Sequence, residues 1–211
     1  MKTTISSLIK VAALCYGNAA MQNVAAQSSD VTFNFDNEET GKLPADWTAA
    51  VSTWLVAVDG SNKAMKQAGK SEGDRFNICV QNKLKYLNLE MEVRIKPLEG
   101  EEDQGGGLVW RYQDAKNYYI TRANPLENNF RVYKVVNGNR KQMQSVNIKM
   151  QKGEWYNIRV VTTGKAVECY YNGQKLLSHS DDTFPNAGLV GFWSKADAVS
   201  LFDDLKVKTL K

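Results

Sequence analysis

The sequence predicts an all-β fold, built as a sandwich or barrel of short strands. More than ten stretches with strand character follow one another, separated by turn-forming residues about every 8–12 positions. No stretch of any length shows the roughly 3.6-residue period of an amphipathic helix. Asn-Gly, which favours two-residue hairpin turns because both residues tolerate positive φ, occurs at 137–138 and 172–173.

The first strand is expected at 31–36, where polar and apolar residues alternate, and a loop containing Gly41, Pro44 and Trp47 follows it. Further strands are expected at 54–58, 64–67 and 76–81. The longest alternation runs over 87–96. Its odd positions are apolar and its even positions are charged or amide residues, which predicts a strand with one buried face.

The segments 108–113, 118–124 and 130–136 predict three strands separated by short turns, and the hairpin turn at Asn137-Gly138 predicts a fourth strand in the residues up to 142. These strands should pair in the middle of one sheet. Alternation puts Tyr118, Ile120, Arg122 and Asn124 on one side of the second strand. In the third strand, Arg131 and Tyr133 point away from the apolar side. Arginines, amides and phenols can bond the hydroxyls of a sugar and stack on its ring. The same residues equally suit a structural face held by internal salt bridges.

Strands at 156–161, 167–171, 175–178, 187–193 and 199–207 complete the pattern, and no linker or composition change appears after residue 30. We therefore expect one domain over residues 27–211. The side chains expected to be largely buried between the sheets are Phe130, Val132, Tyr156, Ile158, Val167, Tyr171 and Val190.

Residues 1–26 are expected to be a secretory signal peptide. Lys2 and Lys10 supply a basic end, and Ile5, Leu8, Ile9 and residues 11–15 supply a short apolar region. Val24-Ala25-Ala26 fits the small-residue rule for cleavage before Gln27. This places the protein outside the cytoplasm, secreted or periplasmic. Removing two lysines changes the net charge from +4 to +2. Such a balanced surface indicates neither a nucleic-acid nor a membrane partner.

Two cysteines remain after cleavage, Cys79 and Cys169. An exported protein can pair them in a disulfide. However, Cys169 is in phase with the apolar Val167 and Tyr171, which favours a buried free thiol. Cys79 is out of phase with its neighbours Ile78 and Val80. The sequence alone leaves both states open.

Several motifs resemble the laminin-G-like branch of the concanavalin A-like lectin/glucanase superfamily. They are Trp110-Arg-Tyr-Gln-Asp with Asn117-Tyr-Tyr, Arg122-Ala-Asn, Tyr133-Lys with Asn137-Gly, and Gly188-Leu-Val-Gly-Phe-Trp193 followed by Phe202-Asp-Asp-Leu. More narrowly, the chain is similar to exported bacterial proteins of the 3-keto-disaccharide hydrolase group, which are also described as family-16-like glycoside hydrolases. The resemblance covers about residues 30–210.

This resemblance implies a jelly-roll β-sandwich of two curved antiparallel sheets that binds carbohydrate on the concave face of one sheet. Arg122 and Arg131, on adjacent strands, should repel each other unless an acid or a ligand lies between them, and Glu90 and Glu92 are the candidate acids from the same sheet. Arginines neutralised by Glu92 would be structural, whereas arginines open to a groove would bind the saccharide. The ligand-binding residues expected on this basis are Glu92, Arg111, Tyr118, Arg122, Asn124, Arg131, Tyr133 and Trp193.

Two other functions stay open. Glu90 and Glu92 are the nearest match to the paired carboxylates of a glycoside hydrolase, although Arg94 stands where a third acid is expected. Cleavage of glycosides or of 3-keto-disaccharides is therefore one alternative, and a structural interaction domain without a sugar site is the other. The only histidine is His179, so no histidine-rich metal site or catalytic triad is indicated.

No organic cofactor is expected. The acids Asp36, Asp203 and Asp204 lie on the two terminal strands, where hard oxygen ligands could hold a structural calcium ion. Gly105-Gly106-Gly107 opens a strand and not a helix, so it indicates close approach of backbones and not a phosphate loop. The sequence leaves the oligomeric state open.

Overall fold

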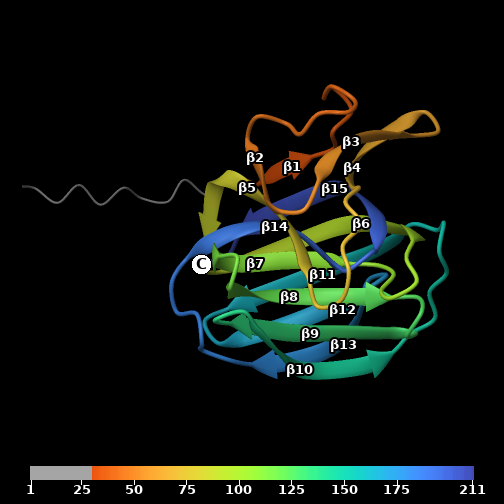
Figure 1. Cartoon of the computed structure of the whole chain (residues 1–211). Helices are drawn as coiled ribbons and strands as arrows, with labels where there is room; N and C mark the ends of the chain where they lie inside the picture. Colours follow the sequence, from red (N-terminus) through yellow and green to blue (C-terminus); the bar gives the residue numbers. More distant parts are fainter. Residues whose placement is uncertain (1–29) are drawn as a thin grey trace, which may run out of the picture.

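The structure is a computed structural model and describes residues 30–211. This part of the chain forms fifteen strands in two antiparallel sheets packed face to face, with no helix among the described residues. In Figure 1 the seven-stranded sheet is the near layer and the eight-stranded sheet lies behind it. The predicted all-β, jelly-roll, concanavalin A-like sandwich is thus confirmed.

The seven-stranded sheet runs in the order β10 (Asn139–Asn147), β9 (Asn129–Val136), β8 (Asn117–Asn124), β7 (Gly107–Asp114), β14 (Gly188–Lys195), β5 (Phe76–Tyr86) and β2 (Trp47–Val51). The eight-stranded sheet runs in the order β13 (Gln174–Ser180), β12 (Ala166–Tyr171), β11 (Tyr156–Thr163), β6 (Leu89–Glu99), β15 (Val199–Thr209), β4 (Asn62–Gln67) and β3 (Trp54–Asp59). The short strand β1 (Val31–Phe33) pairs with the second half of β15.

In strand β6, alternate residues form one face buried between the sheets and one face that points outward. Leu89, Met91, Val93 and Ile95 are fully buried between the sheets, whereas the residues between them are only partly buried and point outward. Burying such a side chain stabilises the fold by about 1.5–3 kcal/mol. The alternation therefore fixes both the strand and the face that packs on the other sheet.

The core predicted from the sequence is confirmed, with one partial exception. Phe130, Val132, Ile158, Val167, Tyr171 and Val190 belong to the cluster between the sheets and are buried. Tyr156 packs against this cluster but is only half-buried, because its hydroxyl reaches Glu154 (2.8 Å) at the surface.

Three elements differ from the sequence-based expectations. β1 ends at Phe33 and not at residue 36, because Phe35 adopts a positive φ of 57° that interrupts the strand. Trp47, expected in a loop, begins β2, and the strand expected after Asn137-Gly138 continues past residue 142 to Asn147 as β10. Both of these strands lie at the edges of the seven-stranded sheet.

The glycines at 105–107 do allow close backbone approach, as expected. A side chain on Gly107 would collide with the Thr121 carbonyl, and one on Gly106 would meet the Trp193 carbonyl.

Cys79 and Cys169 are both buried and free, so the disulfide alternative is wrong for this structure. The expected signal peptide, residues 1–26, lies outside the described residues, and the described part has no helix long and apolar enough to span a membrane.

Candidate functional site

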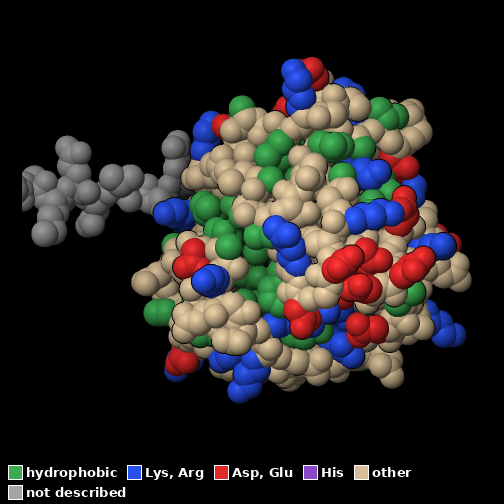
Figure 2. All heavy atoms as spheres, in the orientation of Figure 1, with side chains coloured by type: hydrophobic (Ala, Val, Ile, Leu, Met, Phe, Trp, Pro, Cys, Tyr) green, Lys and Arg blue, Asp and Glu red, His purple; other side chains and the backbone are tan. Residues whose placement is uncertain are grey.

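The outer face of the seven-stranded sheet is the candidate site. Cross-strand register sets Tyr118 opposite Val135 and Ile120 opposite Tyr133, and Trp193 lies opposite Ile78. These side chains form a buried cluster separate from the main core, so they point away from the other sheet. No strand of the described chain packs over them. Figure 2 shows hydrophobic side chains reaching the surface on this face, with Asp and Glu gathered toward its right side.

Arg140 shows that this face is concave. It lies on edge strand β10, separated from β14 by three strands, or about 19 Å in a flat sheet. Yet its guanidinium carbon lies 4.7 Å from the Tyr133 ring centroid, 5.3 Å from that of Phe76 and 5.7 Å from that of Trp193. The sheet must curve to bring these groups together. We call Arg140 with Phe76, Tyr133 and Trp193 the Arg140 cluster, and the outer face the concave face.

Apart from Arg122 Nε, which lies beneath the 100–106 loop, three polar atoms on the concave face are buried without a hydrogen-bond partner among the described residues. They are the Tyr118 hydroxyl, Trp193 Nε1 and Arg140 Nη1. Burial raises the pKa of Tyr118, so its hydroxyl stays protonated at neutral pH. Most buried polar groups in proteins are paired, because an unpaired one costs about 1–3 kcal/mol. Three such atoms on one face indicate a place where a ligand supplies the missing partners.

The 68–75 segment covers part of the concave face, and Tyr112 lies beside the part that this segment leaves open. The Tyr112 ring stacks on Tyr118 at 5.8 Å and is only partly buried. The segment between β4 and β5 passes in front of the sheet in Figure 1. It is held there by the Ser71 N–H, which donates to the Ala196 carbonyl (3.3 Å), and by the Asp74–Lys195 ion pair (3.0 Å). A ligand would therefore meet Tyr112 on the open side of the face.

The expectation that Arg122 is open to a groove is wrong. Arg122 points to the outer face as predicted, but it is buried beneath the 100–106 loop, with 1% of its side chain exposed. Asp103 from this loop accepts from Arg122 Nη1 (2.7 Å) and from Asn124 Nδ2 (3.0 Å). Burial raises the pKa of Asp103 while the Arg122 charge opposes that rise. Arg122 and Asn124 therefore hold the loop, and we do not place them in the site.

Arg131 lies beside this cluster, at the rim. Its Nη1 contacts Glu127 Oε2 (2.7 Å) and the Tyr133 hydroxyl (3.4 Å). Glu127 also pairs with Arg122 Nη2 (2.9 Å), so one carboxylate separates the two guanidinium groups. The predicted need for an acid between the arginines is met by Glu127 and Asp103, and not by Glu92.

Arg111 was expected on the same face and lies on the other one. The register of β7 shifts between Trp110 and Asp114, and Arg111 takes a positive φ of 45°. This bulge reverses the phase of the alternation. The Arg111 guanidinium instead donates to the carbonyls of Phe184 (3.0 Å) and Gly164 at one end of the sandwich.

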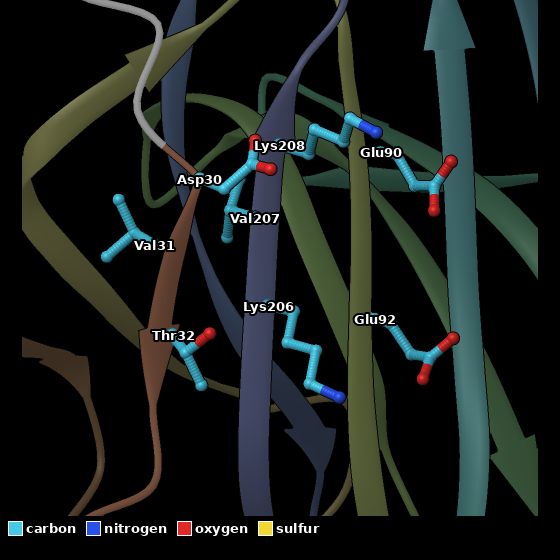
Figure 3. Close-up of a pocket in the computed structure, with 8 residues that line it drawn as sticks. All are labelled: Asp30, Val31, Thr32, Glu90, Glu92, Lys206, Val207 and Lys208. Carbon is cyan, nitrogen blue, oxygen red and sulfur yellow. The ribbon is translucent and has the colours of Figure 1, made fainter.

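Glu90 and Glu92 belong to the eight-stranded sheet, so the expectation that they join the arginines is also wrong. They face outward from β6, opposite Lys208 and Lys206 of β15, and line a pocket of about 280 Å³ beside β1 (Figure 3). Arg159 on the next strand lies 3.5 Å from Glu90 Oε1 and 3.9 Å from Glu92 Oε2. This arrangement is a ladder of opposite charges across three strands.

The candidate calcium ligands are not gathered into a metal centre. Asp203 accepts from Asn62 Nδ2 (2.8 Å) and Asp204 pairs with Arg94 Nη1 (3.0 Å), while Asp36 lies in the exposed loop after β1. Residues 30–211 contain no cluster of three His, Cys, Asp or Glu side chains suited to a metal ion.

Sequence reasoning missed Arg140, Asp103 and Glu127. Arg140 could have been found, because the Asn137-Gly138 turn returns the chain directly into a partner strand for β9. Pairing Arg140 with Val135 would have put it on the same face as Tyr118 and Tyr133.

The two curved sheets and their concave aromatic face define a β-sandwich of the concanavalin A-like class. Residues 30–208 match the model of the 3-keto-alpha-glucoside-1,2-lyase-like domain, and the chain belongs to this family. The family resemblance read from the sequence is thus confirmed. No curated protein matches the chain.

Solved structures share the fold. The carbohydrate binding module CBM66 from Bacillus subtilis is 21% identical, with a TM-score of 0.68, over 78% of this chain and 96% of that one. A Bacillus subtilis protein with a galectin-like fold is 11% identical, with a TM-score of 0.57, over 78% and 89%. The GH43 protein BlXynB from Bacillus licheniformis is 15% identical, with a TM-score of 0.61, over 85% of this chain and 39% of that one. At these identities the likeness concerns the fold.

Proposed function

We propose that this protein binds a saccharide on its concave face and does so outside the cytoplasm, after removal of residues 1–26. The observation that carries this proposal is the group of partnerless polar atoms among aromatic rings on a face that no strand covers. Aromatic rings stack on the apolar faces of pyranoses, and the polar atoms between them bond hydroxyl groups. The fold shared with a carbohydrate binding module supports the same proposal.

The concave face has one side chain suited to a direct test. Tyr112 stacks on Tyr118 at the open rim, where its truncation leaves the main core intact. Tyr170, which stacks under Arg159 on the outer face of the other sheet, is its matched control. Removing one stacking ring should weaken binding by about tenfold, equivalent to about 1.4 kcal/mol.

The experiment begins with a glycan array on residues 27–211, followed by titration calorimetry of the saccharides that bind. Tyr112→Ala should weaken binding about tenfold, while Tyr170→Ala should bind as the parent does. Failure of every saccharide to bind, or equal loss in both variants, would refute binding on the concave face.

The family match favours a second candidate function, cleavage of a glycoside. Glu90 and Glu92 point to one side of β6, about 6–7 Å apart along the strand, between the roughly 5 Å of a retaining pair and the wider spacing of an inverting pair. Reducing-sugar release should be assayed beside the array. If cleavage occurs there, Glu90→Gln and Glu92→Gln should each abolish release. If the protein only binds, no sugar is released and both variants bind as the parent does.

A further inference from the structure

We propose that the saccharide bound on the concave face carries a carboxylate and that Arg140 binds it. This inference rests on the proposed function and specifies the class of its ligand.

Of the cations on the concave face, Arg140 is the one without an ion-pair partner among the described residues. Arg122 pairs with Asp103 (2.7 Å), Arg131 with Glu127 (2.7 Å) and Lys195 with Asp74 (3.0 Å). No carboxylate among the described residues comes within 4.0 Å of Arg140 to form an ion pair, although Asp74 and Asp103 lie close enough to be influenced by its charge. Its guanidinium instead contacts the three rings of the Arg140 cluster. A guanidinium is always charged, so Arg140 is the cation of this face that lacks an ion-pair partner.

Each of the unpaired polar atoms can donate a hydrogen bond. Trp193 Nε1 and Arg140 Nη1 can only donate a hydrogen bond, whereas the Tyr118 hydroxyl, which lies beside Trp193, can accept from it and still donate its own proton. A ligand that completes this set must supply acceptors. A sugar hydroxyl both donates and accepts, whereas a carboxylate has two oxygens that only accept. The donors on the concave face therefore fit a carboxylate better than they fit a neutral sugar alone.

Arg140 is also placed to be reached. Its strand is the sheet edge, and the residue is partly exposed, although its Nη1 is buried. A carboxylate arriving from solvent can form the two parallel hydrogen bonds that guanidinium and carboxylate favour. The surrounding rings exclude water, which strengthens the attraction between the two charges. The sugar ring attached to the carboxylate would then lie toward Tyr112, at the open rim.

Calorimetric titrations of residues 27–211 test this inference. The probes are oligosaccharides of galacturonate and of glucuronate, each compared with the neutral galactose or glucose oligomer of the same linkage and length. We expect at least one uronate to bind about tenfold or more tightly than its neutral counterpart at low salt, and this advantage to shrink in about 1 M sodium chloride. This comparison needs no variant.

Two variants locate the effect. Arg140→Gln should remove the preference for the uronate, and Arg140→Lys should keep part of it, because the charge remains and the paired hydrogen bonds do not. Arg159→Gln is the matched control, since Arg159 stacks on Tyr170 at 3.7 Å on the other sheet. It should leave the preference unchanged. Thermal unfolding of each variant verifies that it is folded.

Each contrary outcome has one meaning. Neutral oligomers that bind as tightly as uronates, or a uronate preference that survives Arg140→Gln, would overturn this inference and leave saccharide binding in place. Loss of the preference in Arg159→Gln but not in Arg140→Gln would overturn it as well. Absence of binding by every neutral and acidic saccharide would overturn the proposed function and this inference together.

Discussion

Arg122 Nη1 lies 2.7 Å from Asp103 Oδ2, and at most 2% of either side chain is exposed. The pair joins strand β8 to the loop at 100–106. Arg122 Nη2 also donates to Asn129 Oδ1 (3.1 Å), and Asn124 Nδ2 donates to Asp103 Oδ1 (3.0 Å). A charge so deeply buried is tolerated only with a partner. This relationship makes Arg122 a structural residue, although its place on the outer face resembles that of a ligand-binding one.

Arg122→Ala should therefore destabilise the protein strongly, by about 3–5 kcal/mol, because it leaves the Asp103 carboxylate buried without its partner. Chemical denaturation measures this loss. Arg131→Ala is the control, because Arg131 pairs with the same Glu127 but is 28% exposed at the rim. It should cost no more than about 1 kcal/mol. Equal effects of the two substitutions would contradict the structural role of Arg122.

The alternation of residues predicted most of this fold. It placed Tyr118, Ile120 and Arg122 on the face opposite Tyr119 and Ala123, as the structure confirms. It assigned no face to β10, which only the preceding Asn137-Gly138 turn predicted, because Asn139–Asn147 is an edge strand whose residues are mostly polar on both faces. Edge strands bury too little of either face to leave an alternating pattern.

The site was harder to predict than the fold. Alternation assigns a face but does not say what covers it, so it could not show that the 100–106 loop buries Arg122. It also assumes an unbroken strand, and the bulge at Arg111 reverses the phase there. Glu92 was placed wrongly because local patterns do not determine which sheet a strand joins, and β6 joins the sheet opposite to the arginines.

The two cysteines should be unreactive in the folded protein. Cys79 and Cys169 are buried on the inner faces of the two sheets, and burial raises the pKa of both thiols. Since the thiolate is the reactive form, a thiol reagent should label neither residue under native conditions and both after denaturation. Rapid labelling of the native protein, or a lack of labelling after denaturation without reductant, would contradict two buried free thiols.

Val167→Ala tests the core between the sheets. Val167 is 2% exposed on β12, and its truncation should cost about 1–3 kcal/mol through lost burial and the cavity left behind. Val58 is 60% exposed on β3, so Val58→Ala should change the free energy of unfolding by less than about 0.5 kcal/mol. An unchanged denaturation midpoint for Val167→Ala would show that the assigned phase of β12 is wrong.

Asp181 makes the structure sensitive to acid. It accepts from Lys134 Nζ (2.6 Å) and from the Tyr119 hydroxyl (2.6 Å), which binds the segment after β13 to strands β8 and β9. Burial alone would raise the pKa of Asp181, but the hydrogen bonds from Lys134, Thr183 and Tyr119 outweigh it, so the pKa lies well below its ordinary value of 3.8. On the other side of this contact, burial and the Asp181 hydrogen bond raise the pKa of Tyr119 to about 12.

Because the pKa of Asp181 is lower in the folded than in the unfolded state, its stabilising effect is complete above about pH 4 and is lost as the pH falls further. Asp181→Asn removes this titration while keeping the shape of the side chain. The parent should lose about 1–2 kcal/mol more stability between pH 6 and pH 2.5 than Asp181→Asn does, as measured by urea denaturation at each pH. Asp182→Asn is the control, because Asp182 is 70% exposed in its pair with Lys165 and should follow the parent. Identical acid sensitivity of the parent and Asp181→Asn would show that the contacts of Asp181 with Lys134 and Tyr119 do not hold this end of the sandwich.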